Sequence, residues 1–123
     1  MTPVVFDASA LLAFLKSEPG AARVEQALAE GGFCSAANWA EVAQKSSGLP
    51  FRWERARAVL RSFGLTIVPV IEADAERAAV LWAPGTTWSL ADRLCLALAD
   101  RLELPALTAD RAWAEHPRAQ LIR

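Results

Sequence analysis

Short apolar runs that resemble β-strands alternate along this chain with longer runs of helical periodicity. The strand-like runs cover residues 4–6, 32–36, 65–70 and 105–110, and residues 119–123 indicate an edge strand. Helical runs lie between them at residues 9–18, 20–30, 38–47, 52–64, 72–83 and 89–103, and residues 111–115 indicate a helical turn. Such alternation favours parallel β-α-β units. We therefore expect an α/β protein, a three-layer α/β/α domain whose mainly parallel central sheet has four to five strands.

Glycine and proline set most of the expected helix ends. The first helical run stops before Pro19, the second is closed by Gly31 and Gly32, and the third by Gly48 and Pro50. Glycine suits the left-handed conformation that often ends a helix, and proline cannot continue one. These residues are the reason for separating the helical runs.

The length and the cysteines bound the class of protein. The 123 residues suit one ordinary domain, so we expect a single domain over residues 1–123. No run reaches the ~18 apolar residues of a membrane span, and the opening "MTPVV" lacks the basic start of a secretory signal. Cys34 and Cys95 lie in apolar runs, which is typical of buried thiols. The sequence therefore predicts a cytoplasmic protein.

The composition points to contacts beyond the core. Hydrophobic residues make up 54% of the chain, which suggests a further interface. The formal net charge of −1 is not that of a basic nucleic-acid binder. If four of the 14 acids are drawn into a metal site, however, ten acids remain against 13 basic residues, and the rest of the surface carries +3. A nucleic-acid partner is therefore compatible with the charge.

The carboxylate of Asp7 stands in unusual surroundings. It is the only charged residue of "VVFDASALLAFL", residues 4–15. An uncompensated carboxylate in an apolar setting costs several kcal/mol. Ligands of parallel α/β sheets bind beyond the carboxyl ends of the strands, and Asp7 and Asp110 each follow a predicted strand. We expect both to face one crevice.

Two more acids share this placement. Glu41 in "NWAEVA" and Asp92 in "SLADRLC" lie in early turns of predicted helices among apolar neighbours. Together with Asp7 and Asp110 they would repel one another at one edge of the sheet. Mg²⁺ or Mn²⁺, which take oxygen ligands, would remove this repulsion. Such a site in an α/β crevice indicates phosphate chemistry, with water activated for in-line attack.

Each acid also has a structural interpretation. Asp7 could cap the first helix, and Asp110 the turn that follows it. Ser89 and Asp92 fit a capping box, and Glu41 could lie on a helix surface near the positive end of the dipole. The coincidence of all four at one predicted edge favours the metal site, and for Asp92 capping and ligation are compatible.

Other polar residues near these acids are candidates for substrate contacts. Ser9 could orient a metal-bound water or a phosphate, or cap the helix. Asn38 shares a helix face with Glu41 and could contact substrate, or be a surface residue. Thr108 could reach the same metal, or simply end a strand. His116 has no serine or cysteine partner motif, so triad chemistry has no support.

A run of arginines is a weaker candidate for contacts with RNA. It comprises Arg52, Arg55, Arg57 and Arg61. Such a run is usually a solvated helix face, but it could also hold an RNA backbone.

Four segments, in order, resemble a known family. They are "VVFDASALLAFLKSEPGA" (4–21), "SAANWAEVAQK" (35–45), "SLADRLCLALA" (89–99) and "LPALTADRAWA" (104–114). Together they resemble the PIN-domain ribonucleases, and within these the VapC-type toxins of toxin–antitoxin pairs. The resemblance covers nearly the whole chain. Ala91 stands where glycine is frequent before the third acid, a departure that removes no ligand.

The resemblance implies a PIN-like fold and an active enzyme. It assigns Asp7, Glu41, Asp92 and Asp110 as catalytic metal ligands, with Ser9 and Thr108 beside them. It further implies Mg²⁺ or Mn²⁺ as cofactor, RNA as substrate, a homodimer and a neutralising antitoxin. We expect the dimer interface and the antitoxin groove to be lined by some of four tryptophans, Trp39, Trp53, Trp82 and Trp88.

Three other classes of protein are alternatives to a PIN-domain ribonuclease. A receiver module needs a lysine after a late strand, and none follows Lys45. A phosphatase with an aspartate nucleophile needs a second aspartate two residues later, where Ser9 stands. A catalytically silent PIN scaffold that binds RNA or protein stays open, because sequence alone does not separate it from an enzyme.

Overall fold

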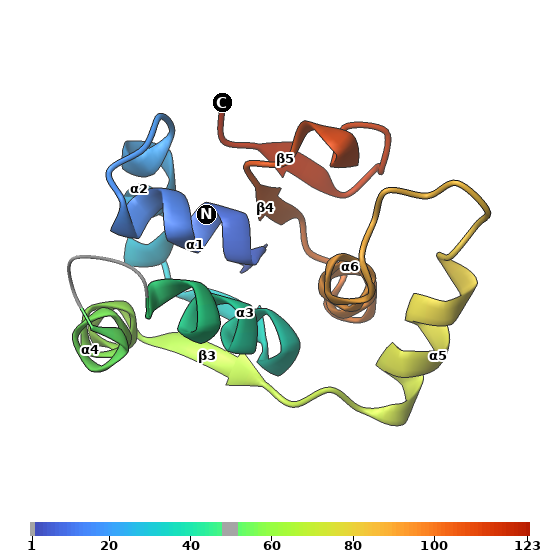
Figure 1. The fold of residues 1–123 in the computed structure, drawn as a ribbon, viewed down its shortest axis with the longest axis horizontal. Helices are drawn as coiled ribbons and strands as arrows, with labels where there is room; N and C mark the ends of the chain where they lie inside the picture. The colour runs from blue at the N-terminus through green and yellow to red at the C-terminus, as the bar shows by residue number, and fades with distance from the viewer. Residues whose placement is uncertain (1, 48–51) are drawn as a thin grey trace.

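A five-stranded sheet organises the protein in this computed structural model, which describes residues 2–47 and 52–123 (Figure 1). The predicted end of the third helical run at Gly48 and Pro50 lies outside the described residues. The strands are β1 (Val4–Phe6), β2 (Gly32–Ser35), β3 (Leu65–Val68), β4 (Ala106–Thr108) and β5 (Ala119–Leu121). The helices are α1 (Ala8–Leu15), α2 (Ala21–Ala29), α3 (Ala36–Ser46), α4 (Trp53–Ser62), α5 (Glu72–Val80) and α6 (Leu90–Leu102), and a 3₁₀ turn, η1, covers Arg111–Trp113.

The sheet is parallel throughout, in the order β3-β2-β1-β4-β5. The first strand of the chain therefore lies at its centre, and the chain adds strands first on one side and then on the other. This confirms the predicted α/β class, and the predicted edge strand is β5, paired with β4. Because every strand points the same way, all five carboxyl ends lie along one edge.

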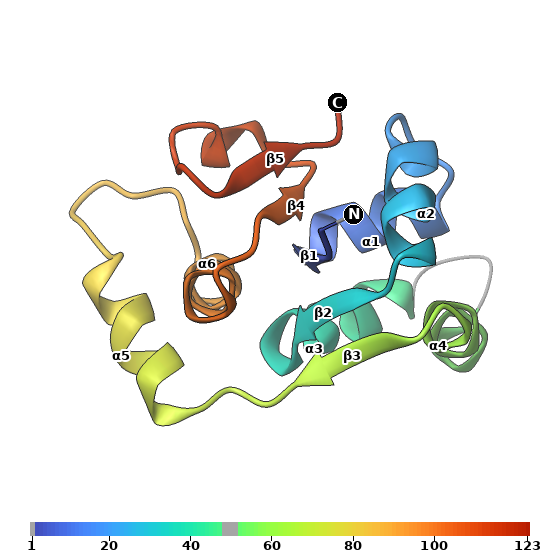
Figure 2. The same ribbon diagram turned by 180° about the vertical axis from the view of Figure 1, so that it is seen from behind.

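The side chains of β1 alternate between the two faces of the sheet. Val4 and Phe6 pack into a core with α1, α2, α3 and α4, whereas Val5 packs into a second core with α6. All three residues are buried, as expected of a central strand covered on both faces. The result is a layered arrangement of helices around the sheet (Figures 1 and 2).

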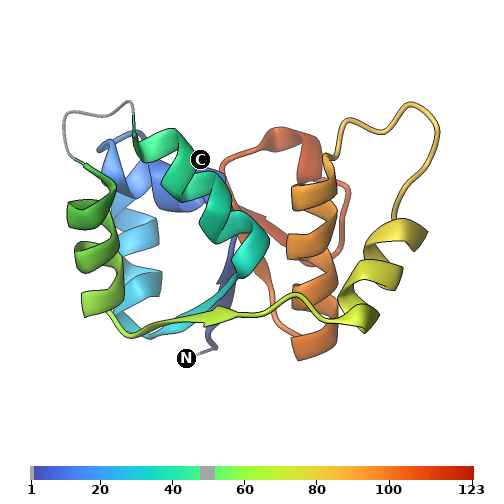
Figure 3. The same ribbon diagram turned by 60° about the horizontal axis from the view of Figure 1, so that its bottom comes forward.

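Helix α5 lies on the outer side of α6, away from α3 (Figures 1 and 3). Arg101 of α6 binds both carboxylate oxygens of the buried Asp74 at 2.8 and 3.0 Å. On the same helix, Asp100 accepts hydrogen bonds from Arg77 and from Arg118. These contacts attach α5 to the body of the protein through α6.

Two backbone features set boundaries of elements, one earlier than predicted and one, the start of β2 at Gly32, as predicted. The first helix ends at Leu15, three residues before the predicted end, because Ser17 adopts a left-handed conformation with φ of 55°. At the start of β2, Gly32 has φ of 150°, and a side chain there would meet the ring of Phe6 at 2.7 Å. The strand can approach β1 this closely only with glycine at that position.

The remaining expectations about the body of the protein have mixed outcomes. Both cysteines are buried and unbonded, as predicted. Trp39 and Trp53 pack edge to face within the fold at 4.9 Å, whereas Trp82 is 56% exposed. Over the described ranges, every helix is too short or too polar to cross a membrane.

Candidate active site

Asp7 lies at the carboxyl end of the central strand and is buried, with 3% of its surface exposed. It occupies the N-cap position of α1, yet its side chain makes no capping hydrogen bond. Instead its Oδ2 atom accepts hydrogen bonds from the hydroxyls of Ser9 and Thr108. The capping interpretation of Asp7 is therefore wrong, and the carboxylate points toward the edge of the sheet.

The two hydroxyls are themselves held by the backbone that follows β4. The amide of Ala109 donates to Ser9 Oγ at 2.9 Å, and the amide of Asp110 donates to Thr108 Oγ1 at 3.0 Å. Each hydroxyl accepts from an amide and donates its one hydrogen to Asp7, so its orientation is determined. Ser9 and Thr108 thus connect the first strand to the fourth.

The charge on Asp7 is disfavoured in this setting. Burial raises the pKa of Asp7 from 3.8 to about 6, and the hydrogen bonds from Ser9 and Thr108 lower it in part. The nearby charges of Asp92 and Glu41 raise the pKa further. Three of the four predicted acids therefore lie close enough to repel one another, as like charges in a poorly solvated site do.

Glu41 comes to this edge from the second turn of α3. Its Oε1 atom accepts a 3.1 Å hydrogen bond from Asn38 Nδ2, one turn earlier on the helix. Asn38 is fully buried and also donates to the carbonyl of Ala91, at 3.2 Å. Contact with substrate, the sequence-based prediction for Asn38, does not suit a side chain in this position.

Asp92 and Asp110 each combine a place at this edge with a structural role. Asp92 Oδ2 accepts from the amide of Ser89, and Ser89 Oγ accepts from the amide of Asp92, which completes the predicted capping box of α6. Asp110 Oδ1 accepts from the amide of Ala112 at 2.9 Å and so caps η1. Capping is therefore confirmed for both residues. Their role as metal ligands stays a prediction.

The four acids share one arrangement of their oxygens. Among the described residues, hydrogen bonds engage Oδ2 of Asp7, Oε1 of Glu41, Oδ2 of Asp92 and Oδ1 of Asp110. In each case a single oxygen orients the carboxylate. The second oxygen of each acid stays outside these hydrogen bonds, which is the arrangement a metal ligand needs.

The residues present fit a hard divalent cation in chemistry. All four candidate donors are carboxylates, the ligands that Mg²⁺ and Mn²⁺ prefer. Within residues 2–47 and 52–123, no three His, Cys, Asp or Glu side chains are close enough to enclose a metal as they stand. Mg²⁺ usually binds only one or two carboxylates directly and keeps several waters, so a hydrated ion does not require three adjacent carboxylates.

The other sequence candidates lie apart from the acids. His116 is buried against Trp88, and its Nδ1 atom accepts from the amide of Arg118. The four arginines of the predicted run are all exposed on α4 or at its start, as a solvated helix surface requires. Arg55 and Arg57 lie about 160° apart around the helix, so the run does not form one narrow stripe, and contact with RNA stays a prediction.

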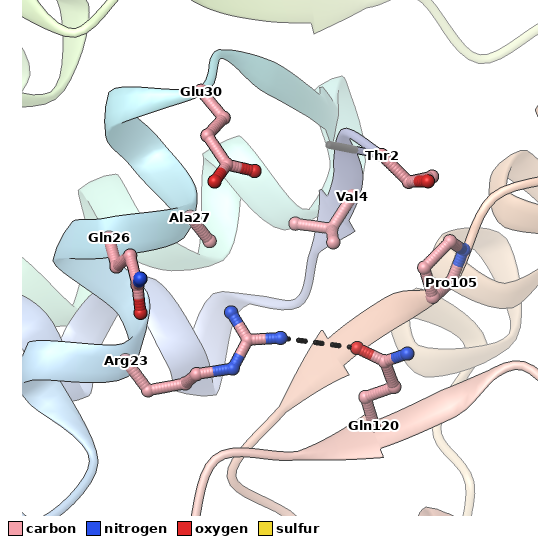
Figure 4. Close-up of a pocket in the computed structure, with 8 residues that line it drawn as sticks. All are labelled: Thr2, Val4, Arg23, Gln26, Ala27, Glu30, Pro105 and Gln120. Carbon is pink, nitrogen blue, oxygen red and sulfur yellow. Dashed lines mark hydrogen bonds between the residues drawn. The ribbon is translucent and has the colours of Figure 1, made fainter.

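A cavity of about 340 Å³ lies at the opposite edge of the sheet, where the strands begin (Figure 4). Arg23 of α2 reaches across it to Gln120 of β5 at 3.3 Å. The full lining is Thr2, Val4, Arg23, Gln26, Ala27, Glu30, Pro105 and Gln120. Glu30 is the one carboxylate in this lining, so the cavity is distinct from the acid cluster.

Residue type was enough to find the acids, whereas several of the groups that orient the site belong to the backbone. The carbonyl of Ala91 and the amides of Ala109 and Ala112 orient side chains of the site. Alanine carries no signal for this role, so sequence analysis did not find them.

Comparison with known proteins agrees with this arrangement. The family model described as "PIN domain" matches residues 4–119. No curated protein is similar enough in sequence to be matched to the chain. Among solved structures, a toxin–antitoxin complex from Klebsiella pneumoniae is similar with a TM-score of 0.78, 22% identity and 98% of each chain covered. A DNA-bound VapBC from Salmonella typhimurium is similar with a TM-score of 0.72, 16% identity and all of each chain covered.

Proposed function

Because the chain belongs to the PIN domain family, we propose that it is an endoribonuclease that depends on Mg²⁺ or Mn²⁺. The observation that carries this proposal is the burial of the Asp7 carboxylate at the carboxyl end of the central strand, together with its raised pKa. A buried carboxylate whose pKa is raised to about 6 by burial and by two neighbouring acids is destabilising unless a cation is bound. Perturbed carboxylates of this kind cluster at functional sites.

The metal would be held directly by the second oxygen of one or two of the four acids, Asp7, Glu41, Asp92 and Asp110, and through its bound waters by the others. When bound, the ion supplies a polarised phosphoryl oxygen and a water acidic enough to attack phosphorus. The chain's own contribution is orientation. Ser9 and Thr108 fix the carboxylate plane of Asp7, and the helix caps fix those of Asp92 and Asp110.

RNA is the proposed substrate, cleaved at phosphodiester bonds. Outside the four acids the charges sum to +3, and one bound divalent cation changes the formal net charge of the chain from −1 to +1. A net positive surface around a bound cation favours a polyanion.

The biological role we propose is that of a VapC-type toxin with a cognate antitoxin and a homodimeric state. The similar structures are described as a toxin–antitoxin complex and as a DNA-bound VapBC. Expression of the protein alone should arrest growth, whereas expression of Asp7→Asn should not. Growth arrest by both would point to toxicity without catalysis.

Cleavage of RNA by purified protein tests the enzymatic proposal. Wild-type protein should cleave with Mn²⁺ or Mg²⁺ and stop in EDTA, and Asp7→Asn should be inactive in all conditions. Cleavage that survives EDTA would overturn the metal mechanism. Binding of RNA without cleavage in any metal would instead support the catalytically silent PIN scaffold.

A further inference from the structure

The amide of Asn38 connects two helices of the site. Its Nδ2 atom donates to Glu41 Oε1 on α3 and to the carbonyl of Ala91 on α6. Both partners are acceptors, so the nitrogen must be the atom that faces them. Both amide hydrogens are thereby used, and the side chain has a single orientation.

The other end of this amide is left without a partner. Asn38 Oδ1 is buried and makes no hydrogen bond to any described residue. An unsatisfied buried carbonyl destabilises the fold, and an apolar side chain of similar size would avoid this cost. Filling the core therefore does not account for an amide at this position, whereas its two donated hydrogen bonds do.

Those hydrogen bonds act on the acids from both sides. One orients the carboxylate of Glu41, and the other holds the residue that immediately precedes Asp92. Glu41 and Asp92 each lie close enough to Asp7 to repel its carboxylate, so α3 and the start of α6 both carry a charge that is repelled from the same point. A single rigid amide between the two helices holds them together against this repulsion.

We propose that Asn38 is a positioning residue, which sets the Glu41 carboxylate and its spacing from Asp92 for one divalent cation. This inference rests on the proposed metal-dependent function. It assigns Asn38 a role through Glu41, in place of contact with substrate. Loss of a residue that hydrogen-bonds a metal ligand typically weakens metal affinity by ~10- to 100-fold.

Direct measurement of Mn²⁺ binding tests this role without reference to activity. Free Mn²⁺ is followed by electron paramagnetic resonance as the metal is titrated into wild type and Asn38→Leu. We expect ~10- to 100-fold weaker binding in the variant. Ser46→Ala is the matched control, because Ser46 is a fully buried polar residue two turns further along α3 whose hydroxyl has no hydrogen-bond partner among residues 2–47 and 52–123. Its Mn²⁺ affinity should equal that of wild type.

The same substitution in a Glu41→Gln protein distinguishes a positioning role from a general loss of structure. If Asn38 acts through the Glu41 carboxylate, Asn38→Leu should weaken Mn²⁺ binding much less in a Glu41→Gln protein than in wild type. Equal losses in both backgrounds would overturn the proposal. Should Asn38→Leu melt early in EDTA, Asn38→Ala replaces it, since alanine removes both donated hydrogen bonds without placing a bulky apolar side chain there, and it should give a loss of the same size.

The outcomes for the two proposals differ. Wild type that binds Mn²⁺ and cleaves RNA, with Asn38→Leu unchanged in both, would overturn the positioning role alone. Wild type that neither binds Mn²⁺ nor cleaves would overturn the proposed function and the positioning role together.

Discussion

The hydroxyl of Thr108 donates a 2.8 Å hydrogen bond to the carboxylate of Asp7 across 101 residues of sequence. The same hydroxyl accepts the amide hydrogen of Asp110. One buried threonine therefore links the acid after the first strand to the acid after the fourth. It lowers the pKa of Asp7 while burial raises it.

Thr108→Val should remove this link without changing the shape of the side chain. The amide of Asp110 loses its acceptor, which should reduce the free energy of unfolding by about 1–3 kcal/mol. The pKa of Asp7 should rise above about 6, because a hydrogen bond to its charged form is gone. Urea denaturation and carboxyl ¹³C titration measure the two effects. Thr66→Val, at an exposed position of β3, is the control and should show neither.

The stability of the metal-free protein should fall as pH rises through the range set by Asp7. The unfolded chain releases this proton near pH 4 and the folded chain near pH 6, so the unfolded state binds fewer protons in between. At about 1.4 kcal/mol per pKa unit, the loss is about 3 kcal/mol. Asp7→Asn should lack this loss in EDTA and match or exceed wild type at pH 7. Thermal melts from pH 4 to 7 compare them, and parallel curves would contradict the assignment.

Burial of His116 should produce a pH dependence of the opposite sign. Desolvation lowers the pKa of His116, with the nearby Arg77 and Arg118 acting in the same direction and Asp100 against it. The unfolded state then binds the proton more readily, so stability falls as pH decreases through the ordinary histidine pKa of ~6.5. His116→Phe should flatten this part of the curve. The comparison belongs in an Asp7→Asn background, where the opposing effect is absent.

Amide replacements should separate capping from ligation at Asp92 and Asp110. Asparagine caps helices about as well as aspartate, so Asp92→Asn and Asp110→Asn should melt within a few degrees of wild type in EDTA. Both should lose Mn²⁺-dependent RNA cleavage by at least the ~10- to 100-fold typical of disturbed metal sites. Full activity in either variant would leave that residue as a cap alone.

Association should depend on exposed apolar residues near α5 and the start of α6. Trp82 and Leu90 are 56% and 59% exposed, and their burial against a second copy would be favourable. Light scattering at micromolar concentration should give a dimer for wild type and a monomer for Trp82→Arg. Val59→Arg, on α4 at 39% exposure, is the control. A monomeric wild type would show that this surface serves another purpose.

The order of strands and helices followed from the sequence because four of the five strands are short, mostly apolar runs that begin at or just after a glycine or proline. Helix ends were less predictable. The predicted 72–83 helix ends at Val80, and α1 stops early because Ser17 takes a left-handed conformation. Neither valine nor serine at these positions predicts the end of a helix, because the backbone conformation there is set by packing of the chain that follows.

The acids of the site were identifiable because carboxylates among apolar neighbours are costly. The role of Asn38 was not, because it depends on the carbonyl of Ala91, 53 residues away. A surface asparagine and a buried one look alike in sequence. Only the approach of α3 to α6 distinguishes them.

The central position of the first strand has a consequence for synthesis. A ribosome releases β1 first and β4 about a hundred residues later, yet Asp7 accepts one of its two hydroxyl contacts from Thr108 at the end of β4. The Ser9 hydroxyl, which makes the other contact, is itself held by the amide of Ala109. Until this segment is made, the nascent chain has Asp7 and Glu41 but lacks Asp110 and the contacts that fix Asp7. The proposed catalytic site is therefore completed only when nearly the whole chain has been synthesised.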